Sequence, residues 1–269
     1  MRDVTAREAF HTVLLREMIA RLKQGAFVLK GGVNLRLFFG NVRYSQDIDF
    51  DLDPLARQPL SQLLRQLLAD REFGLRLKEL GIRGVHYGGR PHKDSTATLR
   101  FKLGLEIPGG ILLPTRIEAS LRDRPEAEDV VVDTADERVV REYLRESDGP
   151  LLIPHYHWMP SIRQKIAALG LRSTVRARDV FDLHVLAHGR ISEIDLGALR
   201  RSVPTQVLQA AHSRVLEISY QEFADQVLTF LDEADRLEYE NEDTWLRIQL
   251  FVAELLDSVM STDREGEVL

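Results

Sequence analysis

Two short stretches decide the fold of this chain: Lys30-Gly31-Gly32 and Arg43-Tyr44-Ser45-Gln46-Asp47-Ile48-Asp49-Phe50. The glycine pair stands between a short apolar run, which predicts a strand over 26–29, and a helix predicted over 33–39. Glycines at such a junction let backbone N–H groups approach an anion at the start of the helix. Gly-Gly turns are common, so the pair alone is a weak indication of a phosphate site.

The second stretch opens a run of alternating acids. Residues 47–53 read Asp-Ile-Asp-Phe-Asp-Leu-Asp, which predicts a strand with all its acids on one face. Asp47 and Asp49 are then neighbours, and two adjacent carboxylates repel each other unless a cation lies between them. Mg²⁺ prefers oxygen ligands and suits such a pair. The alternative is a solvent-facing edge strand whose charges prevent aggregation.

Outward from this centre, the chain changes from mixed to helical. Apolar residues alternate over 99–107, a Pro-Gly-Gly turn follows, and residues 111–121 return as a partner strand. Helices are predicted over 6–24 and 60–68 and, after Pro160, over 160–170, 178–188, 204–217, 221–236 and 242–260. We therefore predict an α/β domain over 1–125, a connector over 126–159 and a helical C-terminal domain over 160–269.

Composition excludes several classes of protein. The 269 residues are 44% hydrophobic and 29% charged, as expected for a globular chain with a sizeable core. The absence of cysteine excludes disulfide scaffolds, thiolate nucleophiles and cysteine-based zinc sites. No apolar run approaches the roughly 18 residues that span a bilayer, and residues 1–5 lack the pattern of a secretion signal. We expect a cytoplasmic protein without a membrane partner.

The charge is unevenly distributed along the chain. Residues 220–269 carry a net charge of −11, which leaves +5 for residues 1–219 out of a total of −6. A basic body is compatible with a nucleic-acid partner, although the acidic end alone reads as a solvated helical face. One tract without any acid, 161–178, contains Arg163, Lys165, Arg172, Arg176 and Arg178. An anionic partner for these cations could be a nucleoside triphosphate or a polynucleotide. Alternatively, some of them pair with acidic residues of the C-terminal region, and we favour this pairing for Arg163 and Arg176.

The two opening stretches resemble the minimal motif of the DNA polymerase β nucleotidyltransferase superfamily, in which Gly-Gly or Gly-Ser precedes Asp-x-Asp on the next strand. The match is closer to the AbiEii/AbiGii-type (MenT-like) toxin nucleotidyltransferase family, with its patterns LKGG…LR…R-x-S-x-DIDF and K-x-x-A-L…R-x-x-x-R-D-x-x-D-L. The matching positions are Leu29–Gly32, Leu35, Arg36, Arg43, Ser45, Asp47–Phe50, Lys165–Leu169, Arg172, Arg176 and Arg178–Leu183. Little matches between the two blocks, and Val33-Asn34 replaces a common Thr-Ala pair.

This resemblance implies a fold and a function. The implied fold is an α/β (α+β) nucleotidyltransferase core with a mixed β-sheet, completed by a helical domain that forms a cleft between the two motif blocks. The implied protein is the toxin of a toxin–antitoxin or abortive-infection system, with a cognate antitoxin and a monomeric state favoured. The implied reaction is Mg²⁺-dependent, with two metal ions, and transfers nucleotides from NTP to an RNA 3′ end, the tRNA acceptor stem, which blocks translation.

The resemblance also implies roles for single residues. The catalytic set is Asp47, Asp49, Lys165 and Asp179. Lys165 would contact the triphosphate. Asp179 would orient a cation or act as a base, and Asp182 is the alternative residue for that role. Asp179 could also be an ordinary acidic residue that interacts favourably with the dipole at the N-terminus of its helix. The expected nucleotide-binding residues are Lys30, Gly31, Gly32, Arg36, Ser45 and Arg172. The expected metal ligands are Asp47, Asp49 and, unless it is an ordinary exposed strand residue, Glu118.

Two other functions are compatible with the sequence. One is transfer of a nucleotide to a protein side-chain hydroxyl, and the other is a non-catalytic NTP-binding module. The intact Lys30-Gly31-Gly32 and Asp-x-Asp motifs argue against the second, because a degenerate module is expected to lose its carboxylates.

Overall fold

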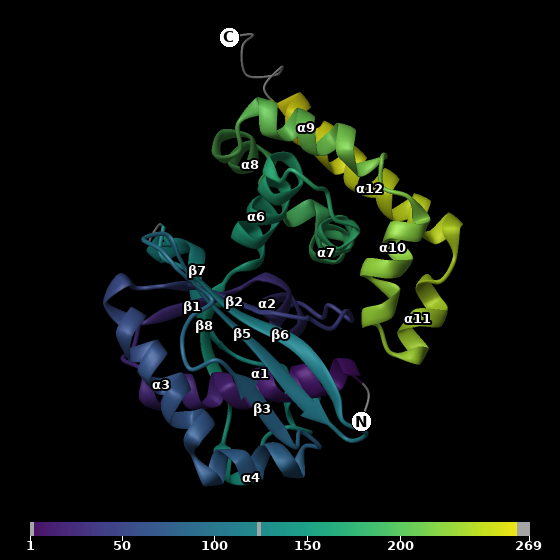
Figure 1. The fold of residues 1–269 in the computed structure, drawn as a ribbon. Coiled ribbons are helices and arrows are strands. Elements are labelled where there is room, and N and C mark those ends of the chain that lie inside the picture. Colours follow the sequence, from purple (N-terminus) through teal and green to yellow (C-terminus); the bar gives the residue numbers. More distant parts are fainter. Residues whose placement is uncertain (1–2, 123–124, 263–269) are drawn as a thin grey trace. The chain divides into compact units, whose positions relative to one another are not determined.

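The computed structural model describes residues 3–122 and 125–262, which divide into two compact units. The first unit comprises Met1–Phe38 and Tyr44–His157, and the second comprises Phe39–Arg43 and Trp158–Leu269 (Figure 1). The chain therefore passes between the units three times. The outer ends of the predicted domains, 1–2 and 263–269, lie outside the described residues, as do residues 123–124 near the predicted boundary.

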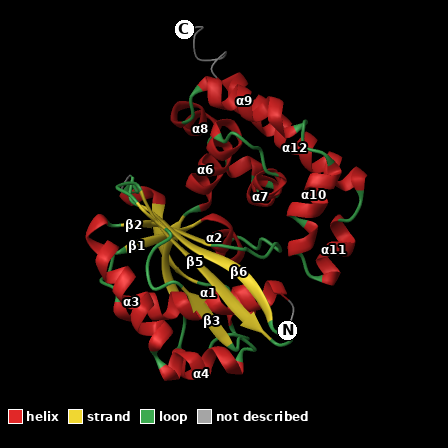
Figure 2. Ribbon diagram, in the orientation of Figure 1, coloured by secondary structure: helices red, strands yellow, loops and turns green. Residues whose placement is uncertain are grey.

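The first unit is built on one mixed sheet, which confirms the predicted sheet type (Figure 2). The strand order is β3-β5-β6-β2-β1-β8-β7, and β4 pairs with β5. The β2–β6 and β1–β8 pairs are parallel, and the other neighbours are antiparallel. The strands are β1 (Phe27–Lys30), β2 (Ile48–Leu52), β3 (Gly84–Tyr87), β4 (Lys93–Asp94), β5 (Thr98–Ile107), β6 (Ile111–Ser120), β7 (Val130–Thr134) and β8 (Leu152–Tyr156).

Three helices pack together on the apolar face of this sheet (Figure 1). They are α1 (Asp3–Arg21), α3 (Arg57–Ala69) and α4 (Arg71–Glu79). The unit also contains α2 (Gly31–Phe38), α5 (Glu137–Val140) and the 3₁₀ turns η1 (Pro54–Ala56), η2 (Ala127–Asp129) and η3 (Glu146–Asp148). Helix α2 contacts β1 and β2, the two strands that carry the motif.

The core determines where the acids of β2 point. Ile48 and Phe50 are fully buried in the core with Phe101 of β5, and burial of each such side chain stabilises the fold by about 1.5–3 kcal/mol. Because side chains alternate along a strand, Asp49 must then lie on the opposite face. A register slip of one residue would place the acids in the core, so the register of β2 is strongly specified.

The second unit is helical. Its elements are α6 (Trp158–Leu171), α7 (Ala177–Ala187), α8 (Leu196–Ser202), α9 (Thr205–Val215), α10 (Tyr220–Gln226), α11 (Glu233–Tyr239), α12 (Glu242–Ser261), η4 (Ile191–Glu193) and η5 (Leu228–Phe230). Helices α6 and α9 approach closely at Gly170, where an added Cβ would overlap the carbonyl oxygen of Val207. Phe223 stacks on Trp245 with ring centroids 4.4 Å apart, and both rings are buried.

The structure differs from the sequence expectations in several elements. Residues 126–159, expected as a connector, contribute β7 and β8 to the sheet of the first unit. The single helix expected over 221–236 is interrupted after Gln226 and restarts beyond Asp232, whose side chain caps α11 by accepting from the Asp235 amide. Helices α4 and α8 and strands β3 and β4 were not expected. The assignment of functional domains stays a prediction.

None of the described helices has both the length and the apolar content that crossing a membrane requires.

Candidate active site

The glycine pair lies at the junction of β1 and α2, as predicted, but the helix begins at Gly31 itself. Gly31 has a φ of +73°, a conformation that other residues rarely adopt. A Cβ built on Gly31 would lie only 2.6 Å from Oδ2 of Asp49. The glycine is therefore required twice, once by its backbone and once by the approach of the β2 carboxylate. This contact joins the two halves of the motif.

The strand pairing places the predicted carboxylates in one row across the polar face of the sheet. Asp49 of β2 is in register with Glu118 of the parallel strand β6 and with Lys30 of β1. Paired residues on neighbouring strands project to the same face. The predicted third carboxylate, Glu118, thus lies on the strand and face that the superfamily motif implies.

Two arginines neutralise acids of this row. Nη2 of Arg116 lies 2.5 Å from Oδ2 of Asp47, and the Arg116 position on β6 directly precedes the Ile48–Ile117 register pair. Arg100 of β5 donates from Nε and Nη2 to Oε2 of Glu118, at 2.7 and 2.6 Å. Both arginines come from the β5–β6 hairpin. Neither was expected from the sequence, because their role depends on strand register.

Lys30 is also engaged within the first unit. Its Nζ lies 2.5 Å from Oδ1 of Asp51, the next acid along β2. The hydroxyl of Tyr156 donates to the other oxygen of Asp51 at 2.6 Å. Lys30 of β1 and Tyr156 of β8 therefore both hold the nearly buried carboxylate of Asp51 on β2. A nucleotide-binding role of Lys30 stays a prediction.

The residues present fit a divalent cation bound by two carboxylates. Oδ1 of Asp47 is buried and accepts no hydrogen bond within the described part of the chain. Across those same residues, no group of three or more histidine, aspartate or glutamate side chains is arranged as a metal site. Mg²⁺ is commonly held by only one or two carboxylates together with substrate phosphates and water. Asp47 and Asp49 supply that number of carboxylates, and metal binding by Asp47, Asp49 and Glu118 stays a prediction.

Two other predicted nucleotide-binding residues, Arg36 and Ser45, line a small cavity of about 10 Å³, enough for one water molecule. Nε of Arg36 donates to Oε1 of Glu8 at 2.8 Å, and its guanidinium lies 4.4 Å from the centre of the Tyr44 ring. Burial raises the pKa of Glu8 although Arg36 opposes that shift. The hydroxyl of Ser45 is buried and has no hydrogen-bond partner in the described structure. Their binding roles stay predictions.

A buried relay supports the peptide that precedes Asp47. Nε2 of His11 lies 2.9 Å from the hydroxyl oxygen of Thr115, which donates to the carbonyl of Gln46 at 2.8 Å. Burial lowers the pKa of His11 to about 3, so the ring is neutral and its Nε2–H donates to Thr115. Sequence reasoning missed this relay, because the three residues come from α1, β6 and the loop before β2.

The helical unit brings together three predicted residues. Nζ of Lys165 lies 3.0 Å from Oδ1 of Asp179, and the second oxygen of Asp179 is ion-paired with Arg172. Nζ of Lys165 also lies 2.6 Å from Oδ2 of Asp182. The second motif block therefore forms one charge cluster on α6, α7 and the turn between them. Both carboxylates are almost completely buried.

Asp182 has a separate partner from the loop 39–43. Nη2 of Arg43 lies 3.0 Å from Oδ1 and 2.8 Å from Oδ2 of Asp182, and Nδ2 of Asn41 lies 2.8 Å from Oδ1. Burial alone would raise the pKa of Asp182, but Arg43 and Lys165 hold it well below its usual value. A carboxylate engaged on both oxygens anchors the loop rather than accepting a proton. The motif string contains Arg43, but its partner could not be read from it.

Arg178 lies beside this cluster and has no carboxylate partner within the described residues. It is half-buried at the start of α7, and no described acid forms an ion pair with it. Burial and the neighbouring charges of Arg176 and Arg43 lower the pKa of Arg178. Two other cations of the acid-free tract, Lys165 and Arg172, find their acids on α7 instead.

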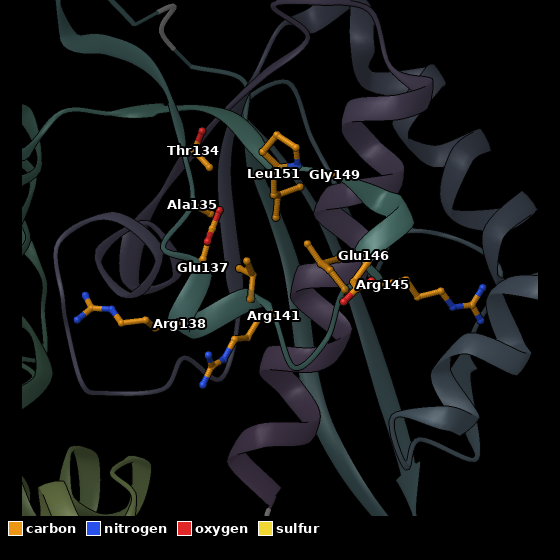
Figure 3. Close-up of a pocket in the computed structure, with 12 residues that line it drawn as sticks. Thr134, Ala135, Glu137, Arg138, Arg141, Arg145, Glu146, Gly149 and Leu151 are labelled. Atoms are coloured by element: carbon orange, nitrogen blue, oxygen red, sulfur yellow. The ribbon is translucent and has the colours of Figure 1, made fainter.

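A wider pocket of about 490 Å³ lies elsewhere in the first unit (Figure 3). It is formed by α5 and the loops on either side of that helix, over residues 134–151. None of the predicted site residues lines this pocket. Its arginine Arg138 is ion-paired with Asp136.

Several solved structures have a similar fold. A protein from H. pylori solved as a proposed nucleotidyltransferase has a TM-score of 0.56 at 20% identity, covering 97% of this chain and 98% of that one. JHP933 from Helicobacter pylori has a TM-score of 0.55 at 18% identity, covering 96% and 95%. MenT4, a nucleotidyltransferase toxin from Mycobacterium tuberculosis H37Rv, has a TM-score of 0.56 at 17% identity, covering 96% and 84%. At these identities the likeness shows the fold alone.

Sequence comparison shows the family. No curated protein matches the chain by sequence. The family model described as "Nucleotidyl transferase AbiEii toxin, Type IV TA system" matches residues 13–251, which contain both motif blocks and most of both units. The chain therefore belongs to the AbiEii nucleotidyl transferase toxin family of type IV toxin–antitoxin systems.

Proposed function

We propose that this protein is a cytoplasmic toxin enzyme that transfers a nucleotidyl group from an NTP to the 3′ end of RNA, with tRNA as acceptor. The observation that carries the proposal is the junction of Gly31 with Asp49, beside a buried Asp47 oxygen that has no hydrogen-bond partner among the described residues. A helix start, two carboxylates and an unused acceptor oxygen together suit a metal-bound triphosphate.

The reaction balances as a displacement at the α-phosphate. The 3′ hydroxyl oxygen forms a bond to the α-phosphorus, the bond from that phosphorus to the bridging oxygen breaks, and pyrophosphate leaves with the electron pair. Asp47 and Asp49 would hold the Mg²⁺ ions. When bound, such ions stabilise charge on the attacking and leaving oxygens. The N–H groups at Gly31 and Gly32 would bind the phosphates.

The charge cluster of the helical unit supplies further groups for this reaction. Lys165 and Arg172 would contact the triphosphate, since both carry donors suited to phosphate oxygens. Asp179 holds Lys165 on one oxygen and Arg172 on the other, so we expect it to orient Lys165. It could accept the hydroxyl proton only after Arg172 moves from Asp179 to the triphosphate. Arg178, which has no carboxylate partner in the described structure, favours an anionic substrate on this unit. An RNA acceptor suits this excess of positive charge better than a protein hydroxyl does.

The family name implies an antitoxin partner, and we propose that this protein is a monomer whose toxicity a cognate antitoxin counteracts. Loss of tRNA charging would then stop translation when the antitoxin is absent.

The experiment that tests the proposal incubates the purified protein with total tRNA and each labelled NTP in turn. RNA and protein are then separated, and the label is counted in each pool. Label in RNA 3′ ends that depends on added Mg²⁺ supports the proposal. Label in protein alone would favour the side-chain alternative, and no label from any NTP would favour a non-catalytic module. Asp47→Asn is the matched inactive control.

A further inference from the structure

Arg116 occupies one of the two oxygens that the carboxylate of Asp47 could offer to a metal. Its Nη2 lies 2.5 Å from Oδ2, whereas Oδ1 of the same carboxylate is buried without a partner among the described residues. The Arg116 side chain is 36% exposed and that of Asp47 is 12% exposed. The guanidinium therefore covers the outer side of a nearly buried carboxylate and still reaches solvent.

Arg116 serves as a counter-ion for the whole acidic row rather than for a single partner. Its hydrogen bond with Asp47, together with the charges of Asp47, Glu118 and Asp49, raises the pKa of Arg116. Glu118 has a second cation, Arg100, but Arg116 is the cation that the structure assigns to Asp47. Removing Arg116 would leave adjacent carboxylates to repel each other.

A divalent cation that enters alone meets a conflict at this position. It has to share Asp47 with a guanidinium or displace that guanidinium into solvent, where it has no partner. A metal that arrives with a triphosphate resolves the conflict, because phosphate oxygens are good acceptors for the planar donor groups of arginine. The exchange moves the guanidinium from one oxyanion to another and leaves the charge balanced.

We propose that Arg116 is a nucleotide-binding residue that exchanges partners, holding Oδ2 of Asp47 in the free protein and moving to a triphosphate oxygen when metal takes Asp47. This inference rests on the proposed function, because it requires a metal and an NTP at the Asp47–Asp49 pair. It implies that metal and nucleotide each strengthen the binding of the other.

The substitution Arg116→Gln gives effects of opposite sign on the two ligands. Without the competing guanidinium, Mn²⁺ alone should bind about three- to tenfold more tightly. Without the phosphate contact, a non-hydrolysable NTP in the presence of Mn²⁺ should bind about tenfold or more weakly, within the usual range of such couplings. A residue that only stabilised the sheet would not move the two affinities in opposite directions.

The matched control is Lys102→Gln. Lys102 pairs with Arg116 in the β5–β6 register and is exposed, and no described carboxylate forms an ion pair with it. Its removal changes the charge of the same face by the same amount but leaves Asp47 and Arg116 in contact. We expect less than a twofold change in either affinity for this variant.

The experiment measures Mn²⁺ binding by electron paramagnetic resonance without nucleotide, and nucleotide binding by calorimetry at saturating Mn²⁺. Thermal unfolding checks that each variant is folded, and Arg116→Lys provides a second variant that keeps the charge but not the planar donor pair. We expect Arg116→Lys to bind Mn²⁺ like the wild type and the nucleotide more weakly.

Unchanged or weaker Mn²⁺ binding by Arg116→Gln would overturn the inference, and so would unchanged nucleotide binding. A wild-type protein that binds neither Mn²⁺ nor nucleotide would instead refute the proposed function itself. The two failures are thus distinguished by the wild-type measurements.

Discussion

Oδ2 of Asp49 lies 2.6 Å from the point that the Cβ of a side chain on Gly31 would occupy. The two residues are 18 positions apart in the chain but form one contact between the β1–α2 junction and β2. The Gly-Gly pair and the Asp-x-Asp strand are therefore in direct contact and form one site. A side chain at Gly31, the first of the two glycines, would displace the carboxylate of Asp49.

Gly31→Ala is expected to cost activity out of proportion to stability. The positive φ should cost about 1–2 kcal/mol of unfolding free energy, and displacement of Asp49 should lower turnover by at least a hundredfold. The measurements are urea unfolding and transfer of labelled nucleotide to RNA.

Gly25→Ala is the control for this substitution. Gly25 has a φ of +76°, but no atom lies within 4 Å of its built Cβ. It should show the same loss of stability and retain activity. Equal activity of the two variants would show that the contact with Asp49 is not needed for the chemistry.

Asp47→Asn and Asp49→Asn should each abolish transfer and leave the chain folded. Loss of a metal-binding charge removes several kcal/mol of transition-state stabilisation, whereas the amide keeps the shape of the side chain. Turnover with labelled NTP is the readout. Asp70→Asn is a suitable control, because Asp70 caps α4 by accepting from the Glu72 amide and asparagine caps helices equally well. Wild-type turnover by either active-site variant would refute the proposal that Asp47 and Asp49 bind the catalytic Mg²⁺.

Lys165 and Arg176 should differ in what their loss affects. Lys165→Ala is expected to reduce turnover even at saturating RNA, because its target is the nucleotide. Both carboxylates that Lys165 contacts keep an arginine partner, so the fold should persist. If Arg176 contacts RNA rather than an acid, Arg176→Ala should weaken RNA binding and reduce its salt dependence by about one unit of slope. A loss of RNA affinity alone in Lys165→Ala would contradict its placement at the triphosphate.

Arg43→Met should destabilise the helical unit by about 3–5 kcal/mol, because it leaves a buried carboxylate with fewer cations. The double variant Arg43→Met with Asp182→Leu removes both members and should recover part of that loss. Chemical denaturation of the four proteins of the cycle gives the coupling energy. Coupling below about 0.5 kcal/mol would show that the buried pair contributes little.

Acid should destabilise the protein partly through His11. Burial lowers its pKa to about 3, so below about pH 6.5 the unfolded chain binds a proton that the folded chain does not. The unfolding free energy should therefore decrease as the pH is lowered from about 6.5 to about 3. For this group the decrease is up to roughly 1.4 kcal/mol per pH unit.

The variant His11→Gln can keep the hydrogen bond to Thr115 but does not titrate. Its urea-unfolding stability should depend less on pH than that of the wild type. A residual slope of the same sign is expected from His184, whose pKa burial lowers to about 4. Equal slopes in the two proteins would show that His11 does not contribute.

Local patterns were sufficient to predict the elements around the motif. The alternation of polar and apolar residues over 47–53 predicts a strand and places Asp47 and Asp49 on the same face of it. Local sequence is enough for this prediction, because successive side chains of any strand point to opposite faces. Strand β8 had no such signal, since it is short, contains Pro154 and pairs with β1 from far along the chain.

The partners of the predicted acids could not be anticipated for a related reason. Arg116 meets Asp47, and Arg100 meets Glu118, only after β6 has found its registers with β2 and β5. Arg43 and Asp182 are 139 positions apart and meet only through the tertiary fold. Sequence periodicity specifies which face a side chain takes, but it does not specify which residue lies opposite.

We expect the loop 39–43 to prevent this protein from being cut into an α/β fragment and a helical fragment. A peptide that ends before residue 158 would carry Arg43 without Asp182, and the remaining piece would keep a buried Asp182 without its arginine. Arg43 then loses its carboxylate partner, and Asp182 keeps Lys165 but loses the two contacts from the arginine. We therefore expect gene fusions, splits and circular permutations at the unit boundary to fail, and recombination between relatives to succeed only when both motif blocks are exchanged together.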